Sequence, residues 1–215
     1  MIMATDRIYT PTEAAAVSGM AVKAVHNAID KKIVETKPDL RSSGAARRAL
    51  TQEGLLRLKL WHGVGSALSA ERREKLFEAI AAMPNAKTVR ADELLIVDVG
   101  AARKQLDAQI RTLDEAEAAI YRDKGILGGE PVFRGTRIPV RMVAAMLAQG
   151  ASVEEILEGY PALAPRMLEL AEIWVAAHPA RGRPKTLDEQ GGRLKSSQRL
   201  TLKGDPRSRR SGTAV

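Results

Sequence analysis

The sequence has 215 residues, a net charge of +8 and a composition that is 45% hydrophobic but only 3% aromatic. It contains no Cys, which excludes disulfide scaffolds and thiol nucleophiles, and its three His are too far apart to favour zinc catalysis. So few aromatic side chains disfavour single-strand recognition by base stacking. No apolar run reaches the roughly 18 residues of a membrane span, and the first residues do not follow the plan of a signal peptide. We therefore expect a soluble, cytoplasmic, non-enzymatic protein without a cofactor or a membrane partner.

The positive charge is concentrated at the two ends of the chain. Residues 1–60 hold ten Lys and Arg against six Asp and Glu, and residues 179–215 hold ten against three. The segments between them are slightly acidic. Two basic zones around a near-neutral middle predict two contacts with anionic partners, either nucleic acid or an acidic protein surface.

Residues 1–62 form the first predicted domain, made of short helices and one hairpin. Thr12 is the expected N-cap of the first helix, and Gly19 is expected to end it. Apolar residues at helical spacing predict a second helix, and a turn-rich segment between two extended stretches predicts a hairpin. The expected elements are helices over 12–17, 21–31 and 52–62 and a hairpin over 33–50.

Two helices of this domain carry the spacing of a helix-turn-helix. Ala15, Gly19 and Val25 supply the small residue at the helix contact, the glycine of the turn and the apolar anchor of the second helix. That second helix presents Lys23, His26 and Asn27 outward, where Asn can pair with adenine and Lys with guanine or phosphate.

The predicted hairpin adds the cations Lys37, Arg41, Arg47 and Arg48. With it, the region resembles the winged helix-turn-helix domain of MerR-type regulators, whose wing lies on DNA phosphates. The alternative is a helical pair whose charges form only a solvated face.

Residues 63–124 predict a helical middle region with a short hairpin. An amphipathic helix over 69–83 is ended by Pro84, and a long helix is expected over 101–120. The long helix carries a narrow apolar stripe that either packs within its own domain or forms the seam of a homodimer; its members are Leu106, Ile110, Leu113 and Ile120.

Residues 125–178 predict a hairpin followed by three short helices. The hairpin segment, 128–140, reads GGEPVFRGTRIPV, and Ser152 with Glu155 forms a capping box for the second helix. Arg134 and Arg137 project from the hairpin, either to pair with Glu130 and helix carboxylates or to contact a partner. The third helix is too apolar and too acidic to read DNA, so we expect it to be buried or to form a dimer.

These motifs, in this order, resemble domain-of-unknown-function family 433, a module found in VapB-type antitoxins of toxin–antitoxin pairs. The layout of winged helix, module and basic tail is similar to that of mycobacterial VapB antitoxins. The resemblance implies a protein that neutralises a cognate PIN-like ribonuclease toxin and represses the promoter of its own operon. The alternatives are a stand-alone winged-helix regulator without a toxin, and an architectural DNA-binding protein that uses the tail.

Residues 179–215 predict a disordered basic tail. Arg181 and Arg183 lie in an Arg-Gly-Arg-Pro segment that resembles an AT-hook, which enters the minor groove of A·T tracts. In the resembling family a C-terminal segment wraps the toxin, which implies toxin contacts for Arg193, Arg199, Arg207, Arg209 and Arg210. Nonspecific DNA binding and a merely solubilising role remain the alternatives for this tail.

The predicted fold class is therefore mainly α with small β-hairpins (α+β), with a winged helix-turn-helix and a small hairpin and three-helix module. Because one winged domain reads only a short half-site, we expect the protein to act as a homodimer.

Overall fold

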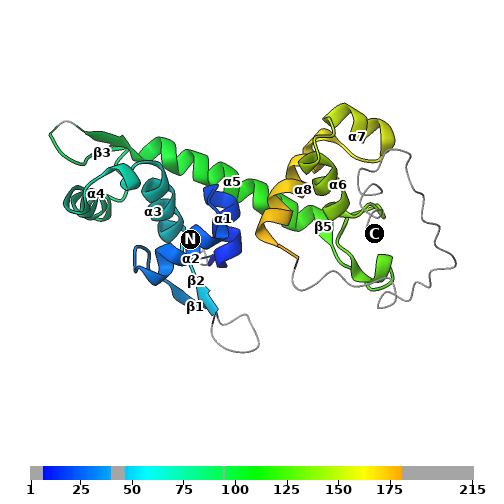
Figure 1. The fold of residues 1–215 in the computed structure, drawn as a ribbon, viewed down its shortest axis with the longest axis horizontal. Helices are drawn as coiled ribbons and strands as arrows, with labels where there is room; N and C mark the ends of the chain where they lie inside the picture. Colours follow the sequence, from blue (N-terminus) through cyan, green and yellow to red (C-terminus); the bar gives the residue numbers. More distant parts are fainter. Residues whose placement is uncertain (1–6, 40–46, 94, 181–215) are drawn as a thin grey trace, which may run out of the picture. The chain divides into compact units, whose positions relative to one another are not determined.

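A computed structural model describes residues 7–39, 47–93 and 95–180. Within these ranges helices predominate, and the strands form small two-stranded antiparallel sheets (Figure 1), so the predicted mainly α class with small hairpins is confirmed. The helices are α1 (Pro11–Ser18), α2 (Val22–Asp30), α3 (Gln52–Gly63), α4 (Ala70–Ala82), α5 (Val99–Ala119), α6 (Val140–Ala148), α7 (Val153–Gly159) and α8 (Pro165–Ala177). The strands are β1 (Lys37–Asp39), β2 (Arg47–Ala49), β3 (Thr88–Arg90), β4 (Ile96–Asp98), β5 (Ile120–Tyr121) and β6 (Val132–Phe133). Two 3₁₀ turns, η1 (Gly65–Ala67) and η2 (Leu127–Gly129), complete the list.

The first helix is capped by Thr10 rather than by the predicted Thr12. The Thr10 hydroxyl accepts a hydrogen bond from the Glu13 N–H, and the Glu13 carboxylate accepts one from the Thr10 N–H at 2.6 Å. Pro11 then occupies the first helical position, where its missing N–H costs nothing, so the cap must precede it. The expectation for Thr12 was wrong because the capping box extends from Thr10.

The end of α1 depends on Gly19, as predicted. Gly19 has a φ of 74°, a left-handed conformation that turns the chain into α2. The N–H of the next residue, Met20, donates to the carbonyl of Ala15 at 3.1 Å. The turn is therefore short and hydrogen-bonded at its exit from the helix.

Replacement of Gly19 by Ala is expected to lower the free energy of unfolding by about 1 kcal/mol, because a β-carbon strains left-handed backbone. No atom lies within 4 Å of the position of the new β-carbon, so the loss is conformational and not steric. Gly63→Ala is the matched control, because its site is equally open and its φ is not positive. Urea unfolding measures both variants, and equal stabilities would contradict the assignment.

The hairpin predicted over 33–50 is present as β1 and β2. The strands pair antiparallel with Lys37 opposite Ala49, and an isolated bridge joins Tyr9 to Leu50. Thr51 then caps α3 by accepting a hydrogen bond from the N–H of Gly54. The N-terminal residues thus close onto the second strand of the hairpin and the start of α3.

The long helix α5 buries its apolar stripe within the chain. The predicted stripe residues Leu106, Ile110, Leu113 and Ile120 are all buried. The helix packs against α1, α3 and α8. Of the two roles expected for this stripe, packing within the chain is therefore the one observed. A homodimer, if formed, would use another surface.

The strand β6 pairs with β5, which the sequence did not predict, and only one of its residues bridges to the end of the predicted hairpin segment, 128–140. Ile120 lies opposite Phe133, whereas Val132 makes only a single bridge to Pro139. Proline has no N–H with which to extend a ladder, and α6 begins at the next residue. The hairpin expected over 128–140 is thereby reduced to a tight turn.

The last three helices begin and end at the residues that the sequence signals predicted. Gly150, with a φ of 91°, follows α6, and Ser152 and Glu155 form the predicted capping box of α7. Pro165 occupies the first position of α8. Among the described helices, none combines the length and apolar character needed to cross a membrane.

The third of these helices, α8, is buried within the chain, the first of the two roles expected for it. It packs against α1, α5, α6 and α7. At its start Arg166 donates to Glu115 of α5 at 2.7 Å and also pairs with Glu169. The hydrogen bond from Arg166 holds the pKa of Glu115 below its ordinary value. The buried residues of α8 are Leu168, Leu170, Ala171, Ile173, Trp174 and Ala177.

Candidate nucleic-acid interface

The turn between α1 and α2 has the packing that the predicted spacing requires. Ala15 and Val25 are 3% and 0% exposed, so the small residue and the apolar anchor both lie in the core. The buried hydroxyl of Ser18 donates to the carbonyl of Ala14 at 2.6 Å, which satisfies its hydrogen-bonding capacity. The two helices are thus held by packing, with no unsatisfied polar group at the turn.

The outer face of α2 carries the residues predicted to read bases. Lys23, His26 and Asn27 are all exposed, while Val25, Ala28 and Ile29 point into the core. Residues three and four apart share one face of a helix, so the three polar side chains lie together. Within the described part of the chain, their side chains make no hydrogen bond or ion pair. They are available to an external ligand.

The hairpin is tied to the end of α2 by an ion pair that sequence reasoning did not find. Arg48 of β2 donates to the carboxylate of Asp30 at 2.7 Å. Both side chains are more than half exposed, so the pair adds little stability. It shows that the second strand of the hairpin lies beside the C-terminal end of α2. Arg48 therefore has an internal partner as well as the predicted phosphate role.

The other predicted contacts are only partly described. Lys37 is exposed at the start of β1, and the backbone of Arg47 lies in β2 opposite Asp39. The side chain of Arg47 is not described. The remaining predicted residues lie outside the described ranges: Arg41, Arg181, Arg183, Arg193, Arg199, Arg207, Arg209 and Arg210.

Two cations at the end of α2 were missed by sequence reasoning. Lys31 and Lys32 are both exposed, and Lys32 has a φ of 54°. They follow the exposed face of α2 directly and add positive charge beside Asp30. The Lys-Lys doublet at the predicted helix end was the signal that could have found them.

The two Arg of the predicted hairpin segment, 128–140, have different surroundings from those expected. Glu130 pairs with Arg141 at 3.6 Å, not with Arg134 or Arg137. Arg134 instead donates to the carbonyl of Ala118 at 3.1 Å, so its role in the chain is to bind the end of α5. Arg137 is exposed at the turn. The expected pairing to Glu130 was wrong because Arg141, on α6, reaches that carboxylate.

No group of three or more His, Asp or Glu suited to a metal ion occurs in the described ranges. The chemistry that these ranges offer is therefore that of exposed amide, imidazole and cationic side chains. Such groups bind anions and hydrogen-bond to base edges.

One known family matches a segment in the C-terminal half of the chain. Residues 120–171 match the family described as "Protein of unknown function (DUF433)". We refer to this match, residues 120–171, as the DUF433 region. This region starts at β5 and ends within α8, so it includes the strand pair that the sequence pattern did not predict.

Two further matches extend over most of the chain. It is 29% identical to the "Uncharacterized protein y4eO" of Sinorhizobium fredii over 212 residues, which cover 88% of this chain and 90% of that protein. The crystal structure of Rv2018 from Mycobacterium tuberculosis is 14% identical, with a TM-score of 0.31. The match covers 76% of this chain and 95% of that one, at a score that establishes no common fold.

Proposed function

We propose that this chain is the antitoxin of a type II toxin–antitoxin system, which neutralises a cognate PIN-like ribonuclease and represses the promoter of the shared operon. The observation that carries the DNA-binding half is the exposed face of α2, with Lys23, His26 and Asn27 beside the β1–β2 hairpin. The DUF433 region supports the toxin-binding half, because the resemblance to VapB-type antitoxins rests on that module.

In this proposal α2 enters the major groove and the hairpin lies on the adjacent phosphates. The buried side of α2, with Val25 and Ile29, anchors the helix so that its polar side faces outward. Asn27 is the candidate for a bidentate pair with adenine, and Lys23 for guanine or phosphate. The Arg48–Asp30 ion pair lies where the hairpin meets the end of this helix.

The toxin half of the proposal depends on charge. Residues 179–215 carry ten Lys and Arg against three Asp and Glu. A PIN-like nuclease holds its metal with several carboxylates, so its cleft is acidic and attracts a cationic segment. Two chains acting as a homodimer would present two reading helices to a two-part operator.

Two other functions use the same DNA-binding face. A stand-alone regulator would bind its promoter without a toxin, and an architectural protein would bind DNA with little sequence preference. The neighbouring gene separates the first from the antitoxin, because an antitoxin is expected beside a short frame with scattered acidic residues. A preference for promoter over scrambled DNA distinguishes the antitoxin from the architectural protein, which would bind both duplexes alike.

Replacement of Lys23 or Asn27 by Ala is expected to weaken promoter binding by roughly 1–3 kcal/mol for each lost base contact, with loss of sequence discrimination. Lys124→Ala is the matched control, because Lys124 is an exposed cation far along the chain from α2. Gel shifts with promoter and scrambled duplexes measure the effect. Promoter recognition through α2 would be contradicted if both α2 variants still preferred the promoter over the scrambled duplex as strongly as the wild type does. It would also be contradicted if the wild-type chain showed no such preference.

A further inference from the structure

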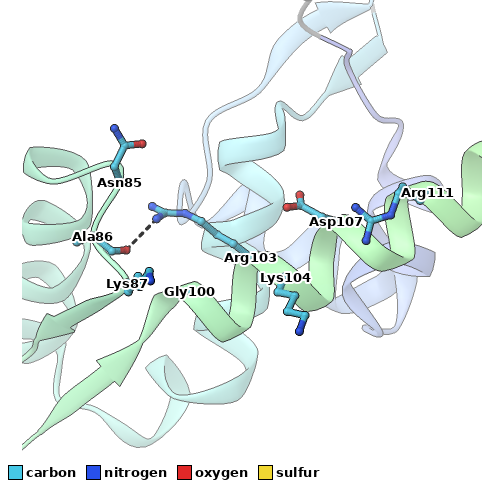
Figure 2. A pocket seen from close by; sticks show the side chains of 8 residues that line it. All are labelled: Asn85, Ala86, Lys87, Gly100, Arg103, Lys104, Asp107 and Arg111. Atoms are coloured by element: carbon cyan, nitrogen blue, oxygen red, sulfur yellow. Dashed lines mark hydrogen bonds between the residues drawn. The ribbon is translucent and has the colours of Figure 1, made fainter.

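A shallow basic groove runs along α5 beside the loop that joins α4 to β3 (Figure 2). Its volume is about 320 Å³. Lys87 lines it from the loop, and Arg103, Lys104, Asp107 and Arg111 line it from the helix. We call these five residues and the space between them the α5 groove.

The groove follows one face of the helix. Arg103, Asp107 and Arg111 recur every four residues, with Lys104 beside them, while Leu106 and Ile110 are buried on the adjoining face. The packing that buries the apolar stripe therefore forces the charged stripe outward. The position of the groove follows from the amphipathic pattern of α5.

The loop wall of the groove is fixed to the helix by backbone contacts. The guanidinium of Arg103 donates to the carbonyl of Ala86 at 2.9 Å, and the N–H of Gly100 donates to the carbonyl of Lys87 at 2.7 Å. A β-carbon at Gly100 would lie 3.4 Å from the Cα of Lys87, so the two segments approach closely. Lys87 is thereby held beside α5 although it is distant from it in sequence.

The charge of the groove is not neutralised within the described part of the chain. Four cationic side chains and one carboxylate line the groove, and that carboxylate, Asp107, accepts a hydrogen bond from the amide of Gln52 at 2.8 Å. The next acidic residue along the helix, Asp114, pairs with Arg7 instead. Lys87, Lys104 and Arg111 make no ion pair with any described residue. The groove therefore offers a concentrated positive field to an external anion.

We propose that the α5 groove binds the sugar-phosphate backbone of duplex DNA, outside the bases read by α2. This inference rests on the proposed DNA-binding function and extends its contact surface. The lining has no aromatic residue on which unpaired bases could stack, which disfavours single strands. Gln52 begins α3, shortly after the hairpin, so its bond to Asp107 links the groove to the segment that carries α2 and the hairpin.

The test compares two charge-removing pairs in the full-length chain. Lys104→Ala with Arg111→Ala removes two cations from the groove, and Lys75→Ala with Lys124→Ala removes two exposed cations that do not line it. Fluorescence anisotropy measures the affinity for the promoter duplex and for a scrambled duplex at several salt concentrations. Melting temperatures equal to that of the wild type show that both variants fold.

The groove pair is expected to lower the slope of log affinity against log salt by about two, roughly one for each lost phosphate contact. Both duplexes should lose affinity by the same factor, several-fold at low salt, with promoter discrimination retained. The control pair should leave the slope unchanged. A slope that stays at the wild-type value in the groove pair overturns the proposal.

The remaining outcomes separate the groove from the proposed function. A wild-type chain that binds both duplexes equally, with a slope that depends on the groove, contradicts promoter recognition and supports the groove. If the Lys104→Ala, Arg111→Ala variant binds DNA like the wild type but no longer captures the toxin, the groove binds an acidic protein, and the proposal is overturned. A wild-type chain that binds neither duplex overturns both.

Discussion

Deletion of residues 179–215 is expected to abolish, or greatly weaken, toxin neutralisation while promoter binding by the N-terminal domain stays largely intact. The deleted segment supplies +7 of the net charge of +8. An Arg from it that enters a carboxylate-lined nuclease site would displace the metal, and charge-assisted pairs would offset the entropy of ordering the segment. Growth rescue on co-expression with the proposed cognate toxin measures the effect.

The deletion is placed so that the described fold keeps its last contacts. His178 is retained, and its carbonyl accepts a hydrogen bond from Arg141 at 2.7 Å. Its ring stacks on Trp174 with centroids 4.5 Å apart. Loss of neutralisation in a chain with an unchanged melting temperature therefore reports on the tail and not on the module.

A second variant narrows the contact to the end of the tail. Replacement of Arg207, Arg209 and Arg210 together by Ala should reproduce part of the loss, whereas a double replacement of Lys75 and Arg90 by Ala, at exposed positions outside the tail and the DUF433 region, should rescue growth like the wild type. The nonspecific-DNA alternative predicts the opposite pattern, with the toxin still neutralised and DNA binding weaker and less dependent on salt. Full growth rescue by the truncated chain would exclude the tail as the inhibitor.

Trp174→Glu is expected to unfold the chain rather than to dissociate a dimer. Trp174 is 4% exposed, and the guanidinium groups of Arg141 and Arg122 lie 5.4 and 5.8 Å from its ring centroid. Loss of a buried aromatic side chain costs about 3–5 kcal/mol, and a buried carboxylate adds a further penalty, which the two cations offset only in part. That total is a large share of the 5–15 kcal/mol typical of a native protein.

Circular dichroism during heating measures the loss, and light scattering measures the mass of what remains. Ala176→Glu is the matched control, because it puts the same charge on an exposed position of the same helix. Trp174→Phe should fold with a smaller loss of stability. A Trp174→Glu chain that stays folded as a monomer, beside a dimeric wild type, would show that α8 forms the dimer seam after all.

Local sequence signals determined most of the helices and the turn that positions the candidate interface. Caps, prolines and the glycine at position 19 act within one helical turn, so their effects can be read without knowing the rest of the fold. The outward face of α2 is likewise fixed by helical spacing, which is why Lys23, His26 and Asn27 lie together as predicted. The error at Thr12 also stayed within one turn.

Only the tertiary structure decided which distant segments meet. The pairing of β5 with β6, the Arg48–Asp30 pair and the approach of Lys87 to α5 each join residues separated by at least ten positions. The same holds for α8, whose apolar residues fit equally well into a core or a dimer seam until its neighbours are known. Hydrophobic and ionic contacts are not directional along the chain, so an apolar or charged pattern shows that a face needs a partner without naming the partner.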